Sequence, residues 1–73
     1  METVKLRDEY IKLGQALKAA GVADTGVMAK EMILDGLVQV NKETEYRRGR
    51  KLYSGDEVTL SNFRSFITVQ VSY

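Results

Sequence analysis

The fold of this chain is decided by residues 10–21, which read YIKLGQALKAAG. Apolar residues recur in this stretch at i, i+3, i+4 and i+7, the spacing that places side chains on one face of a helix. They are Leu13, Ala16, Leu17 and Ala20. We predict a helix from Tyr10 to Ala20, with Asp8 as its N-cap and Gly21 as its C-terminal stop. A helix of about three turns is marginal in water, so it must pack against other elements.

A second helix is predicted in the segment that follows. It begins near Thr25, a residue type that caps helices well, and it ends at Gly36. Its inner face carries Ala29, Met32 and Ile33. The two helices together form a hairpin that needs a partner layer.

The rest of the sequence alternates apolar and polar residues, which is typical of half-buried strands. The alternating stretches lie at residues 4–6, 38–40, 58–60 and 67–71. Turns are predicted at Asn41-Lys42-Glu43 and at Ser54-Gly55-Asp56. The predicted fold class is therefore α+β, with the two-helix hairpin packed on a small, mainly antiparallel β-sheet and residues 4–6 as an edge strand.

Composition limits the chemistry that this protein can perform. The chain has 73 residues, 44% of them hydrophobic and 29% charged, which indicates one small folded domain over residues 1–73. It contains no cysteine and no histidine, so disulfides, thiolate metal sites and histidine bases are excluded. We expect no metal and no cofactor. The sequence offers neither a membrane-spanning stretch nor a secretion signal, and we expect a cytoplasmic protein.

The most unusual segment is basic. Residues 46–53, YRRGRKLY, hold four cations and two aromatics without a carboxylate, in a chain whose formal net charge is only +1. Clustered Lys and Arg bind phosphate backbones through counterion release, and the planar fork of Arg can grip two phosphate oxygens. Nucleic acid is therefore the first partner to consider. The alternative interpretation is a solvated loop whose charges serve solubility.

An ordered set of residues resembles the S4 RNA-binding domain family across most of residues 10–60. The set comprises Leu13, Leu17, Gly21, Ala29, Ile33, Gly36, Val38, Val40-Asn41, Gly55-Asp56 and Val58. Residues 9–15 and the basic segment 47–53 are also similar to the stand-alone bacterial S4-like proteins of the YaaA type. The resemblance implies a single S4-like (αL) domain, with the core motif at about 10–60 and flanking strands at both ends.

The resemblance also implies an RNA-binding surface. The positions that match its basic or polar positions are Lys12, Thr25, Lys30, Asn41, Arg47, Arg48, Arg50 and Lys51. Gln15 and Lys18 are added on geometry, because residues 12, 15 and 18 follow one side of the first helix. Lys42 adds a charge at the turn. For the helix lysines, the competing interpretation is the solvated face of an amphipathic helix.

Three positions depart from the wider family pattern. Gly26 stands where many members have Arg, which moves the expected phosphate contacts from the second helix to residues 47–51. Gly14 stands where many members have Asp. Lys42 replaces the usual Gly, and because Lys tolerates positive φ less well, we expect a different turn geometry there.

The function predicted from the sequence is binding without catalysis. We expect a monomer that recognises structured RNA, with a ribosomal subunit or ribosomal RNA as the preferred partner, because a small basic surface reads phosphate spacing and helix shape. A module that docks on an acidic protein and a duplex DNA-binding protein remain as alternatives. Tyr46 and Tyr53 could stack on unpaired bases, but packing of their rings on the sheet is the preferred interpretation. The carboxylates have no nucleophile and base to accompany them, so an enzyme is not expected.

Overall fold

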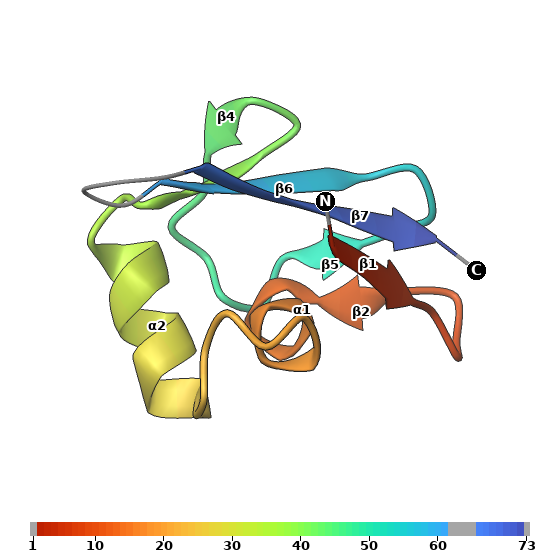
Figure 1. Cartoon of the computed structure of the whole chain (residues 1–73), viewed down its shortest axis with the longest axis horizontal. Helices are drawn as coiled ribbons and strands as arrows, with labels where there is room; N and C mark the ends of the chain where they lie inside the picture. Colours follow the sequence, from red (N-terminus) through yellow and green to blue (C-terminus); the bar gives the residue numbers. More distant parts are fainter. Residues whose placement is uncertain (1, 62–65, 73) are drawn as a thin grey trace.

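The chain folds into two helices and seven strands in the part described by the computed structural model, residues 2–61 and 66–72. In chain order the elements are β1 (Glu2–Lys5), β2 (Ile11–Lys12), α1 (Leu13–Ala19), α2 (Gly26–Leu34), β3 (Val38–Val40), β4 (Glu43–Thr44), β5 (Lys51–Leu52), β6 (Glu57–Ser61) and β7 (Phe66–Ser72). Both helices lie on the same side of the larger sheet (Figure 1). The predicted α+β class is confirmed.

The strands form two sheets of different size. The larger one has the order β1-β7-β6-β3-β4, and its strands are antiparallel except for the parallel pair β1 and β7. The N-terminal strand is therefore an edge strand, as predicted. The smaller sheet pairs β2 with β5, with Ile11 opposite Leu52 and Lys12 opposite Lys51. This two-stranded ribbon places the start of α1 beside the end of the basic segment.

The core lies between the helices and the larger sheet. Alternate residues of β3 and β6 are buried, which confirms the alternation predicted for these strands. The largest fully buried side chains are Leu13, Leu17, Ile33, Leu52, Val38, Val40, Val58, Val69 and Val71. Each such residue contributes roughly 1.5–3 kcal/mol by leaving water. Leu52 extends the core under the small ribbon and fixes β5 against it.

The predicted start of the first helix was wrong. Residues 11 and 12 are strand, α1 begins at Leu13, and its N-cap is Lys12 with φ −76° and ψ 147°. Asp8 lies in the bend before β2. The first-turn N–H donors of Leu13 and Gly14 bond instead to carbonyl groups at residues 50 and 48, at 2.8 and 3.0 Å. A backbone segment from far along the chain thus replaces the side-chain cap.

The second helix follows its sequence signals. The Thr25 hydroxyl accepts a hydrogen bond from the backbone N–H of Met28 at 3.1 Å, so Thr25 is the predicted N-cap. After the helix ends, Gly36 adopts φ 76°, a left-handed conformation that suits glycine. The ring of Tyr46 lies against this glycine, where a Cβ would come within 3.5 Å of the Tyr46 hydroxyl oxygen.

The turn between β3 and β4 corrects a second expectation. Asn41 and Lys42 have φ 51° and 73°, the left-handed backbone at both positions that a type I′ hairpin turn requires. Lys42 therefore adopts the conformation that Gly would favour, contrary to our expectation. The turn is held by the Asn41 side chain, which donates to Asp56 Oδ1 at 3.1 Å and accepts from the backbone N–H of Glu57 at 3.0 Å.

Candidate nucleic-acid interface

The basic segment forms a loop that is attached to the first helix. We call residues 45–50, between β4 and β5, the arginine loop. The backbone carbonyl groups of Arg48 and Arg50 accept the two hydrogen bonds from the first turn of α1, and the N–H of Arg50 bonds to the carbonyl of Arg47 at 3.2 Å. These three bonds hold the backbone of the loop. The backbone of the loop is therefore joined to α1, and their charged side chains project from one structural unit.

A buried carboxylate organises the arginine side chains. Glu45 is only 8% exposed, and its Oε1 accepts from Arg47 Nη2 and Arg50 Nη1, both at 3.2 Å. Its Oε2 accepts from Arg47 Nε at 3.3 Å and from the backbone N–H of Tyr46 at 3.1 Å. We call Glu45, Arg47 and Arg50 the Glu45 clamp. It fixes the orientation of two guanidinium groups from within the loop.

The clamp changes the acidity of its carboxyl group. Hydrogen bonds from the Arg47 guanidinium, opposed by burial and assisted by Arg50, hold the pKa of Glu45 below its ordinary value of 4.5. The same contact raises the pKa of Arg47. Both groups are therefore charged at neutral pH, and the clamp is an ion pair.

Glu45 is a functional residue that the sequence did not reveal, because it lies immediately before the basic segment 46–53. Arg47 and Arg50 are paired internally, although the Arg47 side chain remains 77% exposed and that of Arg50 30% exposed. Among the described residues, the side chains of Arg48 and Lys51 form no ion pair. The signal that could have found Glu45 is its place immediately before two arginines at i+2 and i+5.

The β2–β5 ribbon brings Lys12 next to the arginine loop. Lys12 and Lys51 are directly opposite each other across the ribbon, and both are exposed. Lys51 Nζ lies 4.8 Å from the centroid of the Tyr10 ring, within the range of a cation–π contact. Two lysines that are 39 positions apart in the sequence thus add their charge to one side of the loop.

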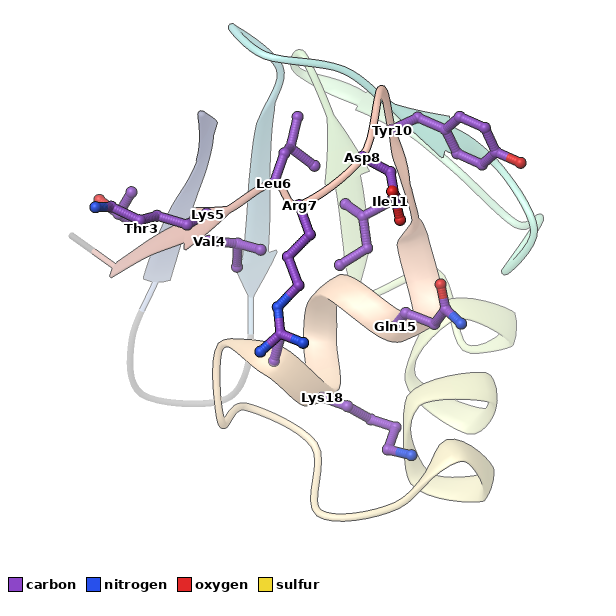
Figure 2. Close-up of a pocket in the computed structure, with 11 residues that line it drawn as sticks. Thr3, Val4, Lys5, Leu6, Arg7, Asp8, Tyr10, Ile11, Gln15 and Lys18 are labelled. Carbon is purple, nitrogen blue, oxygen red and sulfur yellow. The ribbon is translucent and has the colours of Figure 1, made fainter. Parts of the chain in front are cut away.

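The outer side of α1 continues this surface along an open groove. Figure 2 shows Gln15 and Lys18 projecting from α1, while Arg7 extends toward the helix from the loop after β1. The groove between them has a volume of about 480 Å³, with Val4 and Leu6 among the residues that line it. Gln15 also lines a second hollow with Lys12. Arg7 was not among our candidates, since its alternation with Leu6 indicated only an edge strand.

Four of the predicted RNA-binding residues lie away from this surface or have a structural role. The hydroxyl of Thr25 caps α2, and Lys30 is exposed on that helix. The turn that carries Asn41 and Lys42 lies across the larger sheet from α2 in Figure 1. The side-chain amide of Asn41 donates to Asp56 and accepts from the backbone N–H of Glu57 at the start of β6, so its role is structural in the first place. The structure does not gather these four residues with the arginine loop.

Within residues 2–61 and 66–72, no helix is long and apolar enough to cross a membrane. The same residues contain no group of three or more carboxylates that could hold a metal ion.

Comparison with known proteins identifies the class. A family model described as S4 domain matches residues 4–69, nearly the whole chain, and the protein therefore belongs to the S4 domain family. The match is wider than the residues 10–60 that carried the resemblance in the sequence. The chain is also similar to a protein of Bacillus subtilis (strain 168) named "Probable ribosome maturation protein RlbA". The two are 47% identical over 66 residues, which cover 90% of this chain and 93% of that relative.

Proposed function

We propose that this protein is a single domain that binds structured RNA without catalysis. Its binding site is the surface formed by the arginine loop, the β2–β5 ribbon and the outer side of α1. We call this the basic surface, and it comprises Lys12, Gln15, Lys18, Arg47, Arg48, Arg50 and Lys51. One observation carries the proposal: backbone bonds join the loop to α1, and the Glu45 clamp orients the guanidinium groups of Arg47 and Arg50.

A fixed array of cations suits the backbone of an RNA helix. The base edges of A-form RNA lie in a deep, narrow major groove that side chains cannot read, so a protein recognises its phosphate positions and its shape. Arg adds bidentate contacts to phosphate oxygens, whereas Lys acts as a point charge. Preference for RNA over DNA comes from the helix form and the 2′-hydroxyl groups.

Ribosomal RNA is the preferred partner. The printed name of the Bacillus subtilis relative refers to ribosome maturation, and the similarity extends over nearly the whole of both chains. We infer that this protein, as a monomer in the cytoplasm, binds a structured segment of ribosomal RNA. Lys30 and Lys42 are peripheral phosphate contacts in this proposal, while Thr25 and Asn41 position the backbone.

The test measures affinity across a salt series for three ligands: a ribosomal RNA hairpin, a DNA duplex of matched sequence and an unstructured RNA. Arg48→Gln combined with Lys51→Gln removes two charges that lie outside the Glu45 clamp. Each lost phosphate contact lowers the slope of log K against log salt by roughly 0.7 to 0.9, so we expect a decrease of about 1.4 to 1.8.

The matched control is Lys5→Gln, because Lys5 is exposed on β1 and points away from α1 in Figure 2. We expect this single variant to keep the wild-type slope. An unchanged slope in the folded double variant would refute the basic surface as the site. Equal affinity for the DNA duplex would favour the duplex-binding alternative. Failure of all three nucleic acids to bind at low salt, together with binding to an acidic protein, would favour the protein-interaction module.

A further inference from the structure

The β2–β5 ribbon presents four side chains on one face. Lys12 and Lys51 are directly opposite in the ribbon. Tyr10 and Tyr53 lie just beyond its end, where the continued register places them opposite each other and on the same face as the lysines. The ring centroids of the two tyrosines are 6.1 Å apart with an angle of 52° between the planes. Leu52, on the opposite face, is fully buried. The outer face is therefore a row of two lysines beside a row of two tyrosines.

The two tyrosine rings are accessible. Tyr10 is 36% exposed and Tyr53 is 44% exposed, although both are large and mainly apolar. Figure 2 shows the Tyr10 ring pointing away from Arg7 and Lys18. Tyr46 is also exposed, at 59%, but it lies outside the ribbon with its ring against Gly36 at the end of α2. The exposure of the ribbon pair leaves aromatic surface that another planar group could cover.

The two lysines form an arrangement that favours an anion. Like charges directly opposite each other across an antiparallel pair are destabilising. Neither Lys12 nor Lys51 forms an ion pair in the described part of the chain. A phosphate placed between them would relieve the repulsion by binding both ammonium groups.

We propose that one unpaired base of the bound RNA stacks on the ring of Tyr53, whose orientation is set by its contact with Tyr10, and that Lys12 and Lys51 hold the phosphate next to that base. Same-face residues of a strand lie about 6.8 Å apart, twice the rise per residue. A base on the Tyr53 ring thus keeps its own phosphate within reach of the flexible lysine side chains. This inference rests on the proposed RNA-binding function and adds a subsite for a single unpaired nucleotide.

The experiment compares two RNAs: a fully paired ribosomal RNA stem, and the same stem with one unpaired adenosine bulge. We expect wild-type protein to prefer the bulged stem by about tenfold, within the roughly 5- to 150-fold range that base stacking on aromatic side chains supplies. Tyr10→Leu and Tyr53→Leu should each remove most of this preference. Their affinity for the paired stem and their salt slope should stay at the wild-type values.

Two control variants separate stacking from other effects of tyrosine. Tyr46→Leu removes an exposed ring outside the ribbon, and Tyr53→Phe keeps a ring that can stack. Both should keep the preference for the bulge. Circular dichroism verifies that each variant is folded, because a cross-strand aromatic pair also stabilises the ribbon.

A fluorescent readout tests the stacking in the wild-type protein itself. With 2-aminopurine as the bulged base, binding should quench its fluorescence, and Tyr53→Leu should restore it. Suppose that the wild-type protein binds both stems with the expected salt dependence but does not prefer the bulged stem and does not quench 2-aminopurine. This result would overturn the stacking subsite alone. Absence of binding to either stem would overturn the proposed function and the subsite with it.

Discussion

Replacement of Glu45 by Gln tests whether the Glu45 clamp stabilises the arginine loop. The variant keeps the size of the side chain and one acceptor oxygen but removes the negative charge. In the wild-type protein Glu45 accepts three guanidinium hydrogen bonds at 3.2–3.3 Å and two backbone ones at 3.1 and 3.4 Å. The amide NH2 of Gln cannot accept, so the bonds to one of the two oxygens are lost. The remaining bonds weaken, because hydrogen bonds to ionised groups are roughly twice as strong as neutral ones.

The expected cost follows from the exposure of the two partners. The Arg47 side chain is 77% exposed, so solvent screens its ion pair and this pair adds little to stability. The Arg50 side chain is 30% exposed, and its pair lies between a surface value and the 1.5–3 kcal/mol of a buried charged hydrogen bond, at about 1 kcal/mol. We expect Glu45→Gln to lower the free energy of unfolding by about 1 kcal/mol at pH 7. For a domain of this size that is about 4–8 °C in Tm.

The pH dependence gives an independent check on the charge. The folded-state pKa of Glu45 is lowered below its ordinary value of 4.5, so the unfolded chain binds its proton first as the pH falls. The clamp's contribution is therefore complete above about pH 5 and is lost as the pH falls through the lowered pKa. The difference in stability between wild type and Glu45→Gln should shrink by more than half between pH 7 and pH 3.

Urea unfolding followed by circular dichroism, repeated at several pH values, measures both quantities. The matched control is Glu43→Gln, which removes one negative charge from an exposed position on β4. We expect that control to change stability by less than about 0.5 kcal/mol. If Glu45→Gln is no less stable than the control at pH 7, or if its deficit is the same at pH 3, then the ion pair does not hold the loop.

Two further substitutions test local features of the fold. Thr25→Ala removes the hydroxyl that accepts from the Met28 N–H, and we expect a loss of about 1 kcal/mol in thermal unfolding; no measurable loss would contradict its role as a cap. Lys42 has a left-handed φ of 73°, and Lys42→Gly relieves the strain of this conformation, which raises the free energy of unfolding by about 1 kcal/mol. Glycine also gives the unfolded chain more freedom, which lowers the free energy of unfolding by a smaller amount. The variant should be about 0.5 kcal/mol more stable than the wild type. Because it lacks one charge, the salt slope of RNA binding should fall by roughly 0.7 to 0.9. A destabilised variant with an unchanged slope would refute both expectations.

The elements that were predicted correctly are those whose signals lie within one segment. Thr25 and Gly36 mark the ends of α2 through their own side-chain and backbone preferences. The alternation in β3 and β6 reflects burial of one face, and this pattern is visible in the sequence alone. Local preference and global packing agree in these elements, so reading the chain in order is sufficient.

The errors fall where distant residues decide the local structure. Ile11 and Lys12 fall within the helix predicted from Tyr10 to Ala20, but they pair with residues 51 and 52 as a strand. The first turn of α1 bonds to carbonyl groups of the arginine loop, and this partner removes the need for a cap at Asp8. Glu45 was missed for a related reason. Its partners are close in the sequence, but its burial depends on the packing of the whole domain.

Internal pairing of Arg47 and Arg50 does not exhaust their capacity to bind RNA. A guanidinium group has five N–H donors. Arg47 donates from Nε and from Nη2 to the Glu45 side chain, so three of its donors remain. Arg50 donates from Nη1 only, so four of its donors remain. An arginine side chain carries roughly 2 kcal/mol of rotamer entropy. An arginine that is already oriented loses less of this entropy when it binds a phosphate. Glu45 therefore lowers the charge of the loop by one unit but reduces the entropic cost of each contact. In this way a domain of 73 residues can keep Arg47 and Arg50 in a defined geometry before the RNA arrives.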